Sequence, residues 1–151
     1  MRAVIQRVCR ASVGVAGEEV SRIGFGLCCL VGVERSDTDA DIEIIARKIC
    51  SLRIFEDAAG LMNLDVAQVS GDILVISQFT LFGDARKGRR PSYTCAEEPE
   101  RAQELFCELV EKIRGMYPSG RVETGIFQAA MDVSLINHGP VTLLLDSRKN
   151  F

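Results

Sequence analysis

The sequence is poor in the residues that usually build metal sites and nucleophile–base pairs. It contains one histidine, His138, and none of its six cysteines forms a C-x-x-C pair. A zinc site would therefore need thiolates from distant parts of the chain. Cys28 and Cys29 lie in an apolar run, and Cys50 and Cys107 lie in helical patterns. We expect buried free thiols that pack as small apolar side chains, and we expect no metal and no cofactor.

Long apolar runs are also absent. The longest, "LCCLVGV", has the length of a strand rather than of a membrane span. The start of the chain alternates and carries three arginines within ten residues, whereas a secretory signal has a continuous apolar core. No G-x-G-x-x-G motif and no P-loop follows a predicted strand, which disfavours a Rossmann-type nucleotide-binding sheet. We therefore expect a cytoplasmic protein with no membrane segment.

What is present is the composition of an ordinary globular protein. The 151 residues are 47% hydrophobic and 26% charged, which suits one domain covering residues 1–151. The net charge is −3, so the molecule as a whole is no polycation. Four of its eighteen basic residues nevertheless fall in "RKGRR", at Arg86, Lys87, Arg89 and Arg90. Glycine and proline mark an exposed loop, which is either a solvated charged segment or a clamp for phosphate.

Hydrophobic periodicity predicts the secondary structure. Strands are expected at residues 2–17, 18–33, 71–82 and from residue 121 onward. Residues 36–55 and 97–115 instead place apolar side chains at helical spacing. Asp37 or Thr38 can cap the first of these helices, and the second is expected to end at Gly115. The pattern predicts an α/β domain of mostly antiparallel strands with two amphipathic helices.

Two segments depart from this pattern, and the first is "SQFT" at the end of the central strand. It places hydroxyl groups and an amide, from Ser77, Gln78 and Thr80, where an apolar strand meets a loop. Such groups either terminate the strand or line a site that the rigid sheet positions.

The second segment is "INHGPVT", in which Gly139 and Pro140 interrupt a long run of strand-forming residues. Proline has no backbone N–H and glycine weakens a strand, so the pair should be absent from a buried ladder. It forms either a hairpin turn or a backbone shape that faces a ligand. His138 beside it is the only histidine available to a Ser-His or Cys-His pair, although a lone histidine in a turn is more often a solvated polar residue.

Both segments favour a site made of backbone groups with few acids or bases. Backbone N–H groups can stabilise a developing oxyanion, which suits hydrolysis of an activated ester better than cleavage of an amide. The basic loop would hold a phosphate chain nearby. The residues thus predict a small enzyme, or a binding module, for a phosphorylated or nucleic-acid ligand.

Four segments, in order and spacing, resemble the D-aminoacyl-tRNA deacylase family. They are the opening "AVIQRV" with "RASV", then "RIFEDAAGLMN", "SQFTLFGD" and "VSLINHGPVTLLLDS". The resemblance covers nearly the whole chain. It implies a barrel-like homodimer with the active site at the subunit interface and no membrane association. It also implies hydrolysis of the ester between a D-amino acid and the terminal adenosine of tRNA. Glycyl esters mischarged on tRNA-Ala would be accepted as well, because selection rejects the L configuration.

The same resemblance implies roles for particular residues. Gly139 and Pro140 would form a cis pair that reaches into the partner's pocket, where two backbone carbonyls leave no room for an L side chain. Ser77 and Gln78 would line the site, and Gln78 would help to orient the substrate. The Phe79 N–H would donate to the oxyanion.

Thr80 would also line the site in this family. We expect water, assisted by the ribose hydroxyl of the substrate, to be the nucleophile rather than Thr80, because no base stands near it in sequence. The basic residues 86–90 would contact tRNA.

Two positions depart from the family pattern. Many members have an acid in place of His138 and a lysine in place of Leu61. Gly139, Ser77 and Phe79 place the chain with the D-specific group rather than with a sister family that has threonine before the proline. Two other functions remain open: a non-catalytic RNA-binding protein that uses the basic loop, and a thiol or serine hydrolase built on His138.

Overall fold

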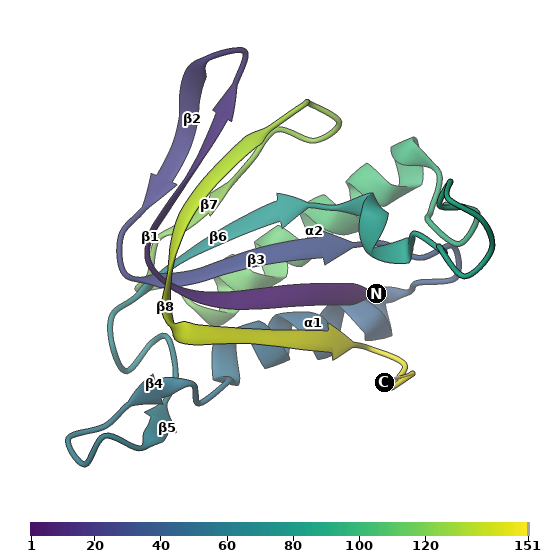
Figure 1. Ribbon diagram of the computed structural model, residues 1–151. Coiled ribbons are helices and arrows are strands. Elements are labelled where there is room, and N and C mark those ends of the chain that lie inside the picture. The colour runs from purple at the N-terminus through teal and green to yellow at the C-terminus, as the bar shows by residue number, and fades with distance from the viewer. Residues whose placement is uncertain (151) are drawn as a thin grey trace.

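The computed structural model describes residues 1–150 and shows a six-stranded sheet with two helices packed on one face (Figure 1). In chain order the elements are β1 (Arg2–Val15), β2 (Glu18–Ile23), β3 (Gly26–Gly32), α1 (Asp39–Ser51), β4 (Phe55–Glu56), β5 (Met62–Leu64), β6 (Asp72–Ser77), the 3-10 helix η1 (Phe79–Phe82), α2 (Pro99–Met116), β7 (Val122–Thr124) and β8 (Asp132–Asp146). Among these residues, no helix is long and apolar enough to cross a membrane.

One side of the sheet is parallel, and the remaining strand pairs are antiparallel. Strands β3, β6 and β7 run parallel, whereas β1 pairs antiparallel with β2, β3 and β8. Helix α1 lies on the connection from β3 to β6, and α2 lies on the connection from β6 to β7. The mostly antiparallel sheet with two helices is confirmed. Its parallel side was not predicted, because the small β4–β5 hairpin hides the alternation of strand and helix in the sequence.

Side chains of β3 and β6 alternate between two apolar cores, which explains why both strands read as continuous apolar runs. Leu27 and Ile73 face a core that the buried stripes of both helices complete. Cys28 and Leu74 face a smaller core beneath β1 and β2. The first half of β1 pairs with β3 and its second half with β2, so the sheet folds over into a nearly closed, barrel-like form (Figure 1).

The Gly139–Pro140 pair lies in the middle of β8, where the strand bulges away from β1. Gln6 pairs with Thr142 and Val8 pairs with Asn137, so the intervening residues of β8 have no partner on β1. A bulge accommodates a proline because no ladder hydrogen bond is needed there. The hairpin-turn interpretation is therefore wrong, since β8 continues in the same direction on both sides of the pair.

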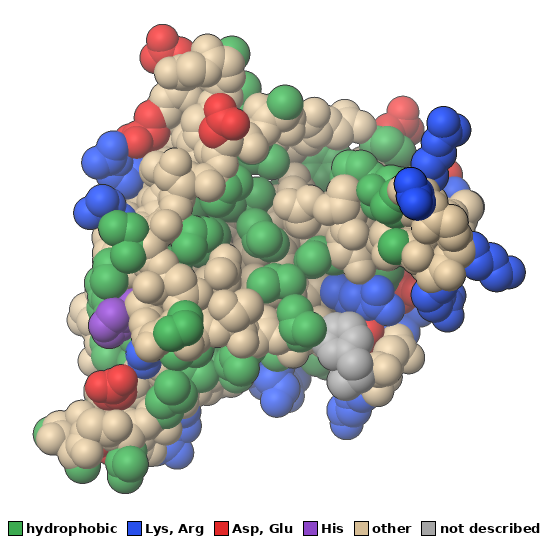
Figure 2. Space-filling model, in the orientation of Figure 1, with side chains coloured by type: hydrophobic (Ala, Val, Ile, Leu, Met, Phe, Trp, Pro, Cys, Tyr) green, Lys and Arg blue, Asp and Glu red, His purple; other side chains and the backbone are tan. Residues whose placement is uncertain are grey.

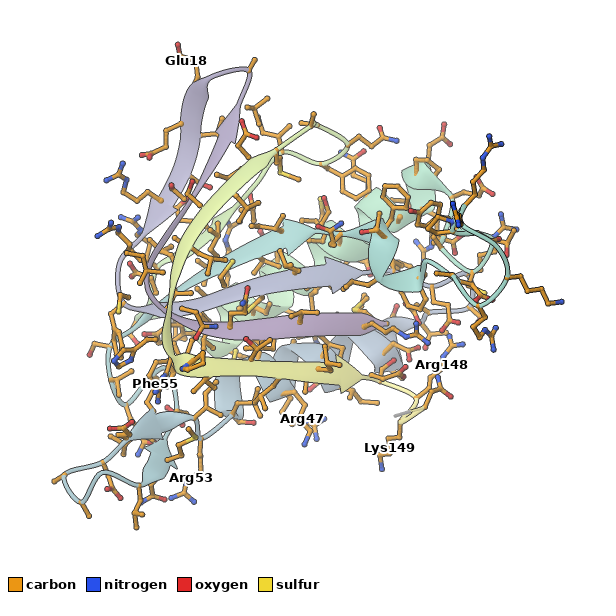
Figure 3. All side chains as sticks on the ribbon, in the orientation of Figure 1. Glu18, Arg47, Arg53, Phe55, Arg148 and Lys149 are labelled. Atoms are coloured by element: carbon orange, nitrogen blue, oxygen red, sulfur yellow. The ribbon has the colours of Figure 1, made fainter. Side chains whose placement is uncertain are left out.

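The β4–β5 hairpin projects from the sheet and is held at its base by Phe55 (Figures 1 and 3). The Phe55 ring is buried and meets Phe25 edge-to-face, with 5.3 Å between ring centroids. Leu61 lies in the exposed turn of this hairpin. The lysine-to-leucine departure from the family pattern therefore falls outside the sheet.

Several local expectations need correction or refinement. Thr38 is the N-cap of α1, as one of the two alternatives predicted. Helix α2 continues through Gly115 to Met116, one residue beyond the expected end. Cys28 and Cys29 are buried, but the expectation of buried thiols is wrong for the exposed Cys9, Cys95 and Cys107. Alternation and helical spacing indicate which face a residue shares but not how far a neighbouring element covers that face.

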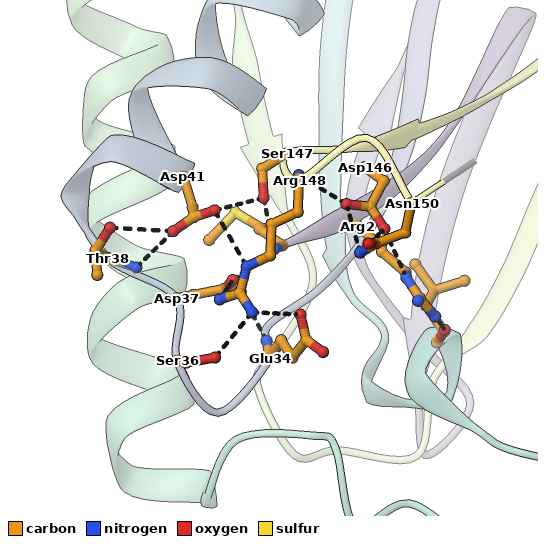
Figure 4. A network of polar contacts seen from close by, with 12 residues as sticks. Arg2, Glu34, Ser36, Asp37, Thr38, Asp41, Asp146, Ser147, Arg148 and Asn150 are labelled. Atoms are coloured by element: carbon orange, nitrogen blue, oxygen red, sulfur yellow. Dashed lines mark hydrogen bonds and ion pairs between the residues drawn. The ribbon is translucent and has the colours of Figure 1, made fainter.

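A polar network ties the end of β8 to the start of α1 (Figure 4). The Ser147 hydroxyl donates to the Asp41 carboxylate at 2.6 Å. The Asp41 carboxylate also accepts from the Thr38 N–H and hydroxyl, at 2.9 and 3.0 Å. Arg148 forms ion pairs with Asp37 at 3.1 Å and with Glu34 at 3.2 Å. Because Ser147 and Asp41 are 106 residues apart in sequence, the network fixes the end of the chain to the start of α1.

Asp41 makes stability depend on pH. Desolvation on burial would raise its pKa, but hydrogen bonds from Ser147 and Thr38 outweigh this and hold the pKa below its ordinary value. The stabilisation is therefore present above the unfolded pKa of about 3.9 and is lost as pH falls through the lower folded pKa. We expect Asp41→Asn to lower the free energy of unfolding by about 2 kcal/mol at pH 7. Urea unfolding should show this difference shrinking below about pH 4; a difference that stays constant would contradict the assignment.

Candidate active site

A cavity of about 420 Å³ opens at the carboxyl ends of the parallel strands β3 and β6. Its walls come from these strand ends, the start of α2 and the loop between β7 and β8. Phe106 of α2 and Phe127 of the loop line it, with 6.0 Å between their ring centroids. The ends of parallel strands are where α/β sheets bind ligands, because the loops beyond them leave a crevice. The position of the cavity and its apolar lining are typical of a ligand-binding pocket.

The "SQFT" segment forms one wall of this cavity. Ser77 ends β6, and Gln78 donates its N–H to the Val31 carbonyl at 2.7 Å, which fixes the exit from the strand. Ser77, Gln78 and Phe79 all line the cavity. The structure therefore places three of the four residues of this segment at the cavity, and Thr80 is not among its lining residues.

Two backbone donors at this wall remain unused. Within residues 1–150, the N–H groups of Phe79 and Thr80 donate to no acceptor. The first N–H groups of a helix have no intrahelical partner, which leaves them available to a ligand. The Thr80 side chain is exposed, and its hydroxyl contacts the side-chain amide of Gln78. No carboxylate or imidazole among these residues forms a hydrogen bond with that hydroxyl.

The Gly139–Pro140 peptide bond is cis, and both residues are exposed. Arg7 holds the segment from below: its Nε donates to the His138 carbonyl at 2.9 Å, and its Nη1 donates to the Ile54 carbonyl at 2.7 Å. The Arg7 side chain is only 3% exposed, which is unusual for an arginine unless it is paired. Arg7 thus fixes the backbone that enters the bulge.

Asn137 fixes the other side of the bulge. Its Oδ1 accepts from the Val141 N–H at 2.7 Å, and its Nδ2 donates to the Val141 carbonyl at 3.0 Å. The side chain therefore closes the loop that carries Gly139 and Pro140. Sequence reasoning identified neither this asparagine nor Arg7. The signal for Arg7 was a charged residue at the inward-facing position after Ala3 and Ile5.

His138 lies beside this segment but forms no nucleophile–base pair. Its ring is exposed and meets Phe25 edge-to-face at 5.5 Å between centroids. In residues 1–150 no serine or cysteine forms a hydrogen bond with its imidazole. Arg7 binds the His138 backbone carbonyl rather than the side chain, so a different side chain at this position leaves that contact in place.

Within one chain, the "SQFT" segment and the Gly139–Pro140 segment do not lie close together. Val8 pairs with both Asn137 and Gly26, and Gly26 pairs with Asp72 at the start of β6. Ser77 lies at the opposite end of β6, five residues further along. At about 3.3 Å per residue, roughly 16 Å separates the two ends of this strand. Gly139 and Pro140 therefore lie far from the cavity of their own chain.

The basic loop joins η1 to α2 and projects into solvent, where Figure 2 shows Lys and Arg side chains gathered at the right of the molecule. Arg86 is engaged by Asp84, with Nη2 and Oδ2 2.7 Å apart. Hydrogen bonds from the Arg86 side chain hold the pKa of Asp84 well below its ordinary value. Lys87, Arg89 and Arg90 are exposed and form no ion pair within residues 1–150. Across the same residues, no cluster of three or more His, Cys, Asp or Glu side chains is arranged to hold a metal ion.

Comparison with known proteins identifies the family. D-aminoacyl-tRNA deacylases of Desulfitobacterium hafniense and Syntrophobacter fumaroxidans are 58% and 56% identical over 151 residues, which span the whole of this chain and of each relative. The solved structure of a c-Myc DNA unwinding element binding protein matches with a TM-score of 0.92 and 41% identity, covering 97% of this chain and 98% of that one. The family model for D-Tyr-tRNA(Tyr) deacylase matches residues 4–146. Agreement of sequence and fold over nearly the full length shows that the chain belongs to the D-Tyr-tRNA(Tyr) deacylase family.

Proposed function

We propose that this chain is one D-aminoacyl-tRNA deacylase domain, which hydrolyses the ester between a D-amino acid and the terminal adenosine of tRNA. The observation that carries the proposal is the cavity at the ends of β3 and β6, with unused N–H groups on one wall and aromatic rings on another. The relatives that match over the whole chain are named for this activity. Such an enzyme would release the free D-amino acid and return the tRNA to translation in the cytoplasm.

The arrangement suits an ester that is already activated. The terminal adenosine would enter the apolar part of the cavity beside Phe106 and Phe127. The ester carbonyl would then point to the N–H groups of Phe79 and Thr80. Water adds to the carbonyl carbon, the carbonyl oxygen becomes an oxyanion, and these N–H groups stabilise it. The intermediate collapses by breaking the bond to the ribose oxygen, which leaves with the proton that the attacking water gives up.

A water nucleophile fits the contacts around Thr80 better than attack by its hydroxyl. A threonine hydroxyl needs a base to become nucleophilic, and its neighbour is the amide of Gln78, which is not a base. The ribose hydroxyl next to the ester would assist the water. Gln78, which lines the cavity, would orient the substrate.

The active unit would be a homodimer in which each Gly139–Pro140 segment reaches the cavity of the partner. Three features support this arrangement: the segment is exposed, Arg7 and Asn137 hold it in shape, and it lies far from its own cavity. The outer side of β8 also exposes apolar side chains, including Leu144, which is 62% exposed. Figure 2 shows hydrophobic side chains spread over this face. A second copy would cover them.

In the partner's cavity, the backbone carbonyls of the segment would face the α-carbon of the amino acid. An L side chain would collide with them, whereas a D side chain would point away. Glycine has no side chain and would pass the same filter. The enzyme would therefore also hydrolyse glycyl-tRNA mischarged on tRNA-Ala.

The test is to incubate the purified protein with D-Tyr-tRNA, L-Tyr-tRNA and glycyl-tRNA, and to measure its oligomeric state by light scattering. We expect rapid loss of the D-tyrosyl and glycyl esters and no acceleration for the L-tyrosyl ester. A folded dimer that accelerates none of them, but binds RNA with a strong salt dependence, would favour the non-catalytic RNA-binding alternative. Equal loss of both tyrosyl esters would contradict the chiral filter.

A further inference from the structure

Two aromatic rings stand exposed at the edge of the cavity, between it and the basic loop. Phe79 is 58% exposed and Tyr93 is 39% exposed. Their ring centroids are 5.1 Å apart and their planes are inclined by 67°. Phe79 also lines the cavity, so this aromatic pair continues the cavity wall outward. The hydrolytic step described above uses the backbone of Phe79 and leaves both rings without a role.

The pair is held in place by the loop itself. A Cβ on Gly83 would come within 2.9 Å of Tyr93 Cε1, so glycine at this position lets the tyrosine ring lie directly on the backbone after η1. Asp84 and Ser92 exchange two backbone hydrogen bonds of 2.7 and 2.9 Å. Tyr93 follows that bridge immediately, so its position is set before any ligand binds.

The same bridge positions the positive charge. Residues 85–91 form the loop that Asp84 and Ser92 close, and this loop carries the basic segment. Arg86 is engaged by Asp84, whereas Lys87, Arg89 and Arg90 point their charges to solvent. Aromatic rings beside exposed cations are the combination by which proteins bind unpaired nucleic acid, with bases stacked on the rings and phosphates near the cations.

Building on the proposed function, we infer that Phe79 and Tyr93 form a stacking platform for the base that precedes the terminal adenosine of tRNA. Lys87, Arg89 and Arg90 contact the phosphates that lead from this base to the acceptor stem. A strand that leaves the cavity passes the platform first and the basic loop next, which is the order of the chemical groups along an unpaired 3′ end. The platform thereby distinguishes a tRNA from a free aminoacyl-adenosine.

The test compares two substrates that share the ester: D-Tyr-tRNA, and D-tyrosyl-adenosine, which lacks every other nucleotide. Loss of one stacked base costs roughly 5- to 100-fold in affinity. Tyr93→Leu, which keeps apolar contact with Gly83 but removes the aromatic face, should raise KM for D-Tyr-tRNA about tenfold. It should leave kcat for both substrates, and KM for D-tyrosyl-adenosine, unchanged. Tyr93→Phe keeps the ring and should behave as the wild type.

A second variant tests the proposed contact between the basic loop and the phosphates. Replacing Lys87, Arg89 and Arg90 together by alanine should raise KM for D-Tyr-tRNA and flatten its dependence on salt, with D-tyrosyl-adenosine unaffected. Equal effects of Tyr93→Leu on both substrates, or no effect on either, would overturn the platform while wild-type hydrolysis still supports the deacylase. A wild-type protein that hydrolyses neither substrate would overturn the proposed function and the platform with it.

Discussion

Replacing Gly139 by alanine is expected to slow hydrolysis of D-aminoacyl-tRNA by about 100-fold or more. Gly139 has φ +134°, which an L side chain rarely adopts. A Cβ there would lie 2.8 Å from Val141 Cγ2 and 2.9 Å from Arg7 Nη2. Arg7 cannot yield, because it is buried and bound to the carbonyls of His138 and Ile54. The bulge must move instead, and a shift of about 1 Å at a substrate-positioning group can cost 100-fold in rate.

Gly17 provides the matched control. It lies in the turn between β1 and β2 with φ +86°, and a Cβ there would meet nothing within 4 Å. Gly17→Ala therefore also places an L residue at positive φ, at a cost of about 1 kcal/mol of stability, but without a collision. Single-turnover rates with D-Tyr-tRNA and melting temperatures should be measured for both variants. If both variants lose similar stability and keep similar rates, the Gly139–Pro140 segment is not part of the site.

The local pattern of the chain predicted its elements well, because periodicity is a local property. Ile42, Ile45 and Ile49 recur at helical spacing, and all three are buried in α1 against the sheet. The stretch around Cys28 and Cys29 was correctly assigned to a strand. What the pattern could not supply was strand partners, since pairing depends on residues far apart in the chain. For this reason the local pattern predicted neither the parallel β3–β6 pair nor the bulge in β8.

The candidate site was predictable in part for the same reason. Polar residues that follow an apolar strand indicated the wall formed by Ser77, Gln78 and Phe79. The opposite wall uses Phe106, which has the periodicity of an ordinary core residue in α2. Only the packing of α2 against the end of the sheet turns that ring toward a cavity. Arg7 acts on Gly139 across more than 130 residues of chain, and no local pattern could connect the two.

Replacing Phe79 by proline is expected to lower kcat by about 100- to 1,000-fold, the usual cost of losing one oxyanion donor. Proline removes the N–H that, within residues 1–150, has no acceptor and would stabilise the oxyanion. Phe79 is the first residue of η1, where proline is tolerated because its fixed φ suits the first turn of a helix and no hydrogen bond is lost. The variant should therefore fold, which circular dichroism and light scattering would verify.

Phe79→Ala distinguishes the role of the Phe79 N–H from the role of its ring. It keeps the backbone donor and removes the exposed aromatic face, so it should raise KM for D-Tyr-tRNA and leave kcat within a fewfold of the wild type. Phe79→Pro loses both groups and should lower kcat for D-tyrosyl-adenosine as well, a substrate that lacks the base proposed to stack on the platform. If the alanine and proline variants have the same kcat on D-tyrosyl-adenosine, the Phe79 N–H does not stabilise the oxyanion. The remaining unused donor, the N–H of Thr80, would then have to do so alone.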